Sequence, residues 1–260
     1  MIAHASPLLR STLGDADLDD PAELYHEASK LYRALGEQQS AGIARLAADP
    51  ELQAAALRAV KRNPQLPAIE LCLPRPPAAS LWTTIAQRRS RQPDAPASLA
   101  LPALATMLHA GYGVSAPARR SVPSGGALYP LEVYVAARRV NGLPCGLFHL
   151  DPERRVLEVL REGDIDAEIS AATPLPELLA NVAAVVFVTA VFARTRVKYG
   201  LRGYRFALLE AGHLVQNVLL AATAVGAHAF PLGGFYDSAV EELLGVNGVD
   251  ESAVYGVVLG

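Results

Sequence analysis

The stretch Val182-Ala-Ala-Val-Val-Phe-Val-Thr-Ala-Val-Phe192 is an unbroken apolar run in the last third of the chain. Its length and its β-branched residues predict a buried strand. Residues 206–229 are apolar on most faces and predict a long helix. Between them, Arg194-Thr-Arg-Val-Lys-Tyr-Gly-Leu-Arg-Gly-Tyr-Arg205 places Lys198 and Tyr199 side by side at a strand-to-helix junction. A rigid scaffold can hold two such proton-transfer groups against a ligand.

The chemistry of this pair depends on its surroundings. Lysine and tyrosine are both weak acids at neutral pH, so either needs a shifted pKa to act as a base or an acid. The alternative interpretation is a solvated junction whose charges keep the start of the helix soluble. Other parts of the sequence decide between these two interpretations.

Composition narrows the class of protein. The 260 residues are 51% apolar and 19% charged, which is typical of a globular protein with a sizeable core. The net charge of −3 gives no reason to expect nucleic acid or an anionic membrane as a partner. Neither a membrane-spanning run nor a signal peptide is recognisable, so we expect a cytoplasmic protein. The two cysteines suit neither a disulfide framework nor a metal site, and we expect no bound metal.

The chain divides at a cluster of prolines in residues 63–80. We predict a helical, alanine-rich N-terminal appendage over residues 1–66 and a main domain over residues 67–260. In the main domain helices alternate with strands and one hairpin, which predicts an α+β fold with a mixed sheet. The predicted helices are 81–89, 101–111, 238–244 and 165–180, the last interrupted by Pro174 and Pro176. The predicted strands are 131–137, 146–150, 155–160 and 253–259.

Three short segments outside the Lys198-Tyr199 junction have ligand-binding chemistry. Arg88-Arg-Ser-Arg91 suits a phosphate, although basic residues also favour a helix C-terminus. Pro123-Ser-Gly-Gly-Ala-Leu-Tyr-Pro130 lets a ligand approach the backbone, unless it is an ordinary loop. Pro231-Leu-Gly-Gly-Phe-Tyr-Asp237 offers bare backbone N–H groups to a flat heterocycle, unless its glycines serve only the turn. Glu210 and His213 share a helix face and have too few companions for a metal site. They predict a buried polar seam that is structural or lies at a subunit interface.

These segments, in this order, resemble the nitroreductase-like flavoproteins, and among them the SagB-type azoline dehydrogenases of thiazole/oxazole-modified peptide pathways. The resemblance begins at Tyr25-His-Glu-Ala-Ser-Lys30, passes through Ile69-Glu-Leu-Cys-Leu-Pro74 and becomes specific from Arg88 onward. It is strongest in Pro123-Ser-Gly-Gly-Ala-Leu-Tyr-Pro-Leu-Glu-Val-Tyr134 and in Lys198 to His213.

The resemblance implies an FMN-binding homodimer with two flavin sites at the subunit interface, each drawing residues from both chains. It also implies that Lys198 and Tyr199 are catalytic, a pair that generic nitroreductases lack. The residues that it implies for flavin binding are Arg88, Arg89, Ser90, Pro123, Ser124, Gly125, Gly126, Pro231, Gly233 and Gly234. Two departures concern the phosphate: Gln92 stands where the family often has a basic residue, and no basic extension follows Gly260.

The implied activity is FMN-dependent oxidation of peptide thiazolines or oxazolines to the aromatic azoles, with dioxygen as the electron acceptor. One of Lys198 and Tyr199 would be the general base, and the residues alone leave open which one. Implied partners are the azoline-bearing peptide and a cyclodehydratase complex. The alternatives are a nicotinamide-dependent nitro- or quinone reductase and a non-catalytic flavin-binding subunit of a modifying complex.

Overall fold

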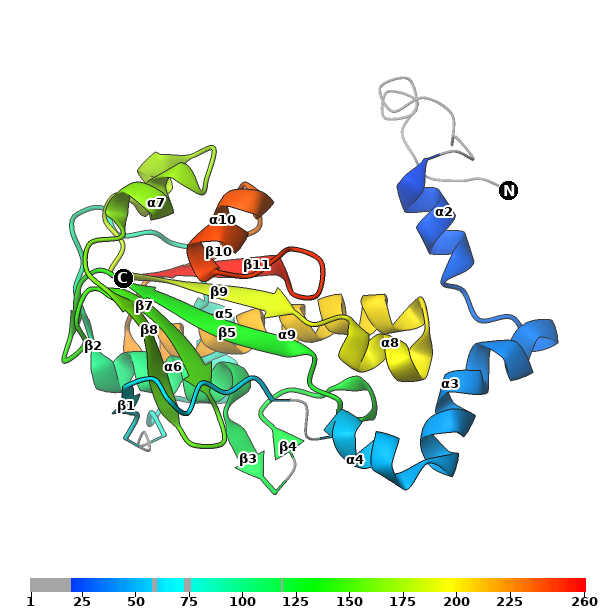
Figure 1. Ribbon diagram of the computed structural model, residues 1–260. Helices are drawn as coiled ribbons and strands as arrows, with labels where there is room; N and C mark the ends of the chain where they lie inside the picture. The colour runs from blue at the N-terminus through cyan, green and yellow to red at the C-terminus, as the bar shows by residue number, and fades with distance from the viewer. Residues whose placement is uncertain (1–19, 58–59, 73–75, 118) are drawn as a thin grey trace.

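The computed structural model describes residues 20–57, 60–72, 76–117 and 119–260. Its centre is a seven-stranded sheet in the order β1-β8-β7-β5-β9-β11-β10 (Figure 1). All six pairings in this sheet are antiparallel, and a parallel pairing joins the separate short strands β2 and β6. The strands are β1 Ala68–Glu70, β2 Leu99–Ala100, β3 Val114–Ala116, β4 Arg119–Arg120, β5 Leu131–Ala137, β6 Val140–Asn141, β7 Gly146–Asp151, β8 Val156–Glu162, β9 Ala184–Ala190, β10 Ala229–Leu232 and β11 Ser252–Leu259.

Helices cover both faces of the sheet, which confirms the predicted α+β class (Figure 1). The helices are α2 Pro21–Ala28, α3 Gly36–Ala48, α4 Pro50–Leu57, α5 Leu81–Gln87, α6 Leu101–Tyr112, α7 Asp166–Ala171, α8 Ala193–Tyr199, α9 Arg202–Val225 and α10 Asp237–Leu244, with 3-10 turns at Arg33–Leu35, Gly125–Ala127 and Pro176–Leu179.

Two apolar clusters form the core, one on each face of the sheet. Helices α6 and α9 pack together and cover the larger cluster, which includes Val133, Val186 and Leu214. Helices α7 and α10 cover the smaller one, around Phe187 and Val240. By length and composition α9 could cross a membrane, but 44% of its apolar window is buried inside the fold.

The apolar run of residues 182–192 contains strand β9, which is buried along its whole length. It pairs with β5 on one side and β11 on the other, so both of its edges are hydrogen-bonded. The helix predicted over 165–180 is interrupted, as its prolines indicated. Helix α7 ends at Ala171 and a 3-10 turn begins at Pro176, because proline lacks the amide donor that a continuous helix needs.

Helix α3 packs against α8 (Figure 1), and α4 packs against α3. Helix α2 is hydrogen-bonded to the start of α9 and to the residue before it. Residues 61–63 then run onto the sheet, where the Lys61 ammonium donates to Tyr134 Oη at 2.6 Å and pairs with Glu251 at 2.8 Å. Part of the predicted appendage, residues 1–19, lies outside the described residues. A division of the chain at residue 66 remains a prediction.

Candidate functional site

Lys198 and Tyr199 lie in the last turn of α8, the short helix between β9 and α9. The sequence placed them at a strand-to-helix junction, and the structure inserts this helix into that junction. Gly200 follows with a φ of +56°, a conformation that favours glycine, and it separates α8 from α9. The two side chains are therefore fixed at a bend of the backbone.

The pair converges on the glycine loop, here the segment Pro123–Tyr129. A Cβ atom built on Gly126 would lie 2.8 Å from Lys198 Nζ and 2.8 Å from Tyr199 Oη. Gly126 has a φ of +67°, a backbone conformation that favours glycine, and an added Cβ would displace the ends of both side chains. A Cβ built on Gly125 would lie 3.1 Å from the Phe206 ring. The structure thus brings together two segments more than 70 residues apart that the sequence marked separately.

The glycine loop has unusual backbone conformations. Ala127 has a φ of +56° and Tyr129 a φ of +44°, values that cost free energy in residues other than glycine. Side-chain contacts hold the loop in place. Ser124 Oγ accepts a hydrogen bond from the Tyr129 amide at 2.9 Å, and Tyr129 Oη accepts one from the Arg120 amide at 3.0 Å. Such strain persists only where surrounding contacts fix the structure, as they often do at functional sites.

Glu210 lies buried behind the glycine loop with 1% of its surface exposed. Tyr112 Oη donates to Glu210 Oε1 at 2.7 Å, while Glu210 Oε2 makes no hydrogen bond to the described residues. Burial raises the pKa of Glu210 to about 7, and the hydroxyls of Ser124 and Tyr112 and the charge of Arg120 limit the rise. Of the predicted polar seam, Glu210 is buried within the chain, whereas His213, one turn further along α9, is exposed in the single chain.

A second buried polar network connects the start of β5 to α8. Glu132 pairs with Arg194 at 2.6 Å and with His149 Nε2 at 3.1 Å, and Glu158 pairs with His149 Nδ1 at 3.0 Å. Burial lowers the pKa of His149, but these two carboxylates outweigh it and raise the pKa above its ordinary value. Arg194 also donates to the Tyr129 carbonyl at 3.3 Å, so this network supports the glycine loop from below.

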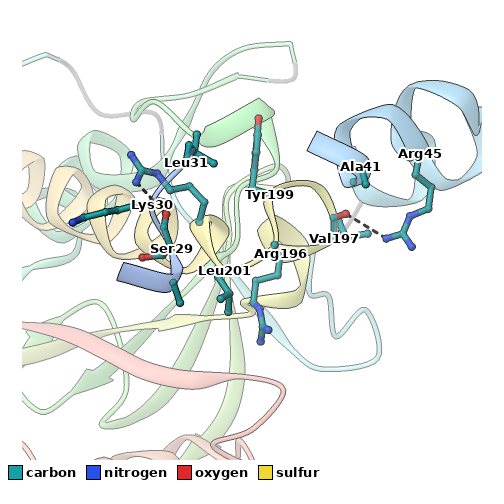
Figure 2. Close-up of a pocket in the computed structure, with 13 residues that line it drawn as sticks. Ser29, Lys30, Leu31, Ala41, Arg45, Arg196, Val197, Tyr199 and Leu201 are labelled. Atoms are coloured by element: carbon teal, nitrogen blue, oxygen red, sulfur yellow. Dashed lines mark hydrogen bonds between the residues drawn. The ribbon is translucent and has the colours of Figure 1, made fainter. Parts of the chain in front are cut away.

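Two cavities flank Tyr199. One, of about 460 Å³, lies between the end of α2, helix α3 and the α8–α9 bend, and Figure 2 shows Tyr199 in it between Leu31 and Ala41. The other, of about 430 Å³, is mostly apolar and is lined by Leu31, Ile43 and Phe206 as well as by Tyr199. Tyr199 therefore borders space large enough for a substituent of a ligand.

The predicted phosphate-binding residues lie elsewhere. Arg88, Arg89 and Ser90 directly follow α5, and the Arg91 amide donates to the Ala229 carbonyl beyond the C-terminal end of α9. There, Arg89 and Arg91 line a polar cavity of about 470 Å³ together with His228. Its lining residues include no carboxylate, which suits an anion.

Pro231, Gly233 and Gly234 lie at the sheet edge, where β10 ends. Pro231 and Leu232 pair with β11, so the first part of this segment is a strand and not a turn. Both glycines are exposed and leave open space: a Cβ on Gly234 would meet nothing within 4 Å, and one on Gly233 would contact only Tyr255, at 3.8 Å.

The candidate residues thus fall into two groups within one chain. Lys198, Tyr199 and the glycine loop lie before the N-terminal end of α9, and Arg88–Ser90 lie at its C-terminal end. Helix α9 has 24 residues and is about 36 Å long. Sequence reasoning did not select Arg202, Phe206, Glu210 or His228 for a site. The spacing of four residues from Arg202 through Phe206 to Glu210 was a usable signal, since residues at this spacing share a helix face.

Comparison with known proteins identifies the family of this fold. Residues 85–260 match the model of the nitroreductase family. MJ1384 of Methanocaldococcus jannaschii, named as a nitroreductase, is 34% identical over 68% of this chain and 89% of its own length. The microcin B17-processing protein McbC of Escherichia coli is 30% identical over 50% of this chain and 49% of its own. The trifolitoxin-processing protein TfxB of Rhizobium leguminosarum is 28% identical over 57% of this chain and 41% of its own.

Solved structures give the same result. A nitroreductase-type protein from Anabaena variabilis superposes with a TM-score of 0.66 at 28% identity, covering 76% of this chain and 42% of that one. A chain of the E. coli microcin synthetase McbBCD complex, solved with truncated pro-MccB17 bound, has the same fold with a TM-score of 0.59 at 21% identity, covering 90% of this chain and 98% of that one. The family match spans more than half of the chain, and the protein belongs to the nitroreductase family of oxidoreductases.

Proposed function

We propose that this protein is an FMN-dependent dehydrogenase that oxidises thiazolines or oxazolines in a ribosomally made peptide to thiazoles or oxazoles. The observation that carries the proposal is the convergence of Lys198 Nζ and Tyr199 Oη on Gly126. Similarity to McbC and TfxB, which are named for processing microcin B17 and trifolitoxin, supports a peptide substrate.

The residues present fit FMN, the cofactor that we propose. The polar cavity at Arg89 and Arg91 suits its phosphate, and Ser90 adds a hydroxyl beside it. Gly233 and Gly234 leave the backbone open to a flat ring, and Gly126 lies under the ends of the Lys198 and Tyr199 side chains. When bound, FMN supplies the hydride acceptor for aromatisation.

One chain cannot bring these residues to a single flavin, because the two groups are separated by the length of α9. We therefore propose a homodimer with composite sites. We call Lys198, Tyr199 and the glycine loop the glycine-loop half, and Arg88, Arg89, Ser90 and Arg91 with Gly233 and Gly234 the arginine half. Each site would combine the glycine-loop half of one chain with the arginine half of its partner.

The exposed surface of α9 suits such a dimer. Leu208 and Leu209 are 41% and 60% exposed, and Trp82 on the neighbouring helix α5 is 78% exposed. At the middle of α9, Gly212 is exposed and has open space around its Cα. Two α9 helices that pack antiparallel about this glycine would bury the apolar surface and place the N-terminal end of each against the C-terminal end of the other.

The Lys198-Tyr199 pair would remove the ring proton in this site. Azoline aromatisation takes one proton and one hydride from the ring, so a base is needed on the side of the substrate. One of the two residues acts as the general base and the other orients it or shares the proton. Their position at the bend after α8 keeps both groups directed at the same point.

The test is azole formation by the purified full chain. We expect it to purify with FMN, identified by mass spectrometry after denaturation, and to convert an azoline peptide to the azole with dioxygen as acceptor. Its assembly with a cyclodehydratase, as in the complex named for McbBCD, is tested by adding the unmodified precursor and that enzyme. Rapid NADPH-dependent quinone reduction without azole formation would contradict the proposal and indicate a general reductase.

A further inference from the structure

We propose that the cleft between the N-terminal helices and the α8–α9 bend binds an acidic segment of the peptide substrate. The cleft consists of the two cavities that share Leu31, Tyr199 and Arg202 as walls. That the ligand is a peptide rests on the proposed function. That the ligand is acidic rests on the charged residues of the cleft.

The first wall of the cleft is anchored by hydrogen bonds at the end of α2. Arg202 donates to the Ser29 carbonyl at 3.2 Å, and Arg205 donates to Ser29 Oγ at 2.7 Å. Tyr25 Oη donates to the Leu201 carbonyl at 3.2 Å. Arginine side chains at the carbonyl end of a helix also interact favourably with its dipole. These contacts fix the segment after α2 next to Tyr199.

The second wall, helix α3, packs directly on the backbone of α8. A Cβ built on Gly42 would lie 2.7 Å from the Val197 carbonyl oxygen and 2.6 Å from that of Lys198, so only glycine permits this approach. Arg45, one turn further along, donates to the Val197 carbonyl at 3.4 Å (Figure 2). The helix is therefore held against the segment that carries the proposed catalytic pair.

The charge of the cleft has a single sign. Among the side chains that the structure describes, its lining includes no aspartate or glutamate. Its cationic residues are Lys30, which pairs with Glu27 at 2.5 Å, and Arg33, Arg45, Arg196 and Arg202. In the described part of the chain Arg45, Arg196 and Arg202 form no ion pair with a carboxylate, whereas Arg138, Arg154 and Arg161 elsewhere do. Because the whole chain carries −3, this excess is local.

Carboxylate side chains are the natural partners of such a surface. Guanidinium groups bind carboxylates through paired hydrogen bonds, and a concave wall strengthens the field of its charges. Tyr199 lines both cavities. A peptide that crosses the cleft from one cavity to the other would therefore pass next to Tyr199. Aspartate or glutamate residues near the azoline would then place the ring beside the pair.

The test measures binding to the FMN-loaded full chain by fluorescence anisotropy. The probes are two labelled thiazole peptides of equal length, one with Asp and Glu around the ring and one with Asn and Gln at the same positions. The proteins are the wild type, Arg196→Glu, Arg45→Gln and Arg161→Glu. Arg161 lies on β8 outside the cleft, is half-exposed and undergoes the same charge change as Arg196.

We expect the acidic peptide to bind about 5- to 10-fold more tightly than the amide peptide to the wild type. Arg196→Glu and Arg45→Gln should each weaken the acidic peptide by about 2- to 5-fold and leave the amide peptide unchanged. Added salt should reduce the preference. Equal affinities for both peptides, or equal losses in Arg161→Glu and Arg196→Glu, would overturn the inference.

A parallel assay of azole formation separates this inference from the proposed function. If the wild type oxidises acidic and amide azoline peptides but binds both equally, the function stands and the acidic cleft is wrong. If it oxidises neither, yet binds the acidic peptide in a manner that depends on Arg196, the cleft stands and the function is wrong.

Discussion

The glycine-loop half and the arginine half of the proposed site differ in how far a single chain completes them. The glycine-loop half is complete within one chain. Lys198 Nζ and Tyr199 Oη both lie next to Gly126, and buried polar residues, among them Glu210 and Arg194, stabilise the loop. The arginine half is open. The Arg89 guanidinium bonds to the carbonyls of Ala86 and Arg88 at the end of α5, and its cavity faces outward.

We infer from this difference that the two halves have different roles, one in positioning side chains and the other in binding the cofactor. In the proposed site, strained backbone and a buried carboxyl would hold the Lys198 and Tyr199 side chains in position before any ligand arrives. Exposed arginines beside an open cavity instead become ordered around a phosphate when it binds. We therefore expect substitutions in the first half to affect the chemical step and substitutions in the second to affect cofactor retention.

The largest effect is expected for Lys198→Ala. If the pair removes the ring proton, this change should lower azole formation by about 100-fold or more, the usual contribution of a general base. Bound FMN should be retained, since the arginine half is untouched. Tyr199→Phe serves as the matched variant, because it keeps the ring that packs edge-on against Phe206 at 5.0 Å. Normal turnover in both variants would show that the pair is not catalytic.

Glu210→Gln should change how stability depends on pH. The carboxyl has an ordinary pKa near 4.5 when unfolded and about 7 when buried. The folded state thus binds the proton more tightly, so stability falls as the pH rises from about 4.5 through about 7, by about 3 kcal/mol. The glutamine variant lacks this loss and should be the more stable protein above pH about 8. Urea titrations across pH measure it, and parallel curves for the two proteins would contradict the assignment.

Replacement of both Arg89 and Arg91 by alanine should release the cofactor. Each charged hydrogen bond that is lost should weaken FMN binding by about 10-fold or more. Fluorescence titration with FMN gives the affinity, and Arg161→Ala, outside the site, is the control. Unchanged FMN affinity in the double variant would place the phosphate elsewhere.

Gly126→Ala should have the smallest effect on stability, about 1 kcal/mol for a side chain at positive φ. Its effect on turnover should exceed that on stability, because the methyl group would displace the tips of Lys198 and Tyr199. Gly212→Ala is the control, because a Cβ at this position meets no other atom of the same chain. Thermal unfolding of both variants, measured on dilute protein, compares their stabilities. Full azole formation in Gly126→Ala would show that the convergence on this residue has no catalytic role.

Much of the fold could be predicted from the sequence, because strong local patterns govern the elements concerned. Strand β9 follows from an apolar run rich in β-branched residues, and β5 from a shorter stretch with two valines and a tyrosine. Glycines directly after α6 and α10 mark the C-terminal ends of these helices. Helix α8 was missed because only Gly200, in a stretch of mixed composition, marks its end.

The candidate site could be predicted only in part. Motif order singled out Lys198 and the glycine loop, but their meeting at Gly126 depends on how β5 and β9 pair, which local patterns do not specify. The burial of Glu210 and the exposure of His213 depend on the rotation of α9 against α6. The separation of the two halves by the length of α9 was likewise invisible, because residues distant in sequence give no measure of distance in space.

Subunit mixing tests the central claim most directly. Lys198→Ala chains and Arg89→Ala/Arg91→Ala chains, each inactive alone, are co-expressed with different affinity tags, and the heterodimer is isolated. If each azoline-oxidising site combines the glycine-loop half of one chain with the arginine half of its partner, one site in the heterodimer has no substitution. The account predicts that azole formation returns to about half of the wild-type rate per dimer. A heterodimer as inactive as its parents would contradict it.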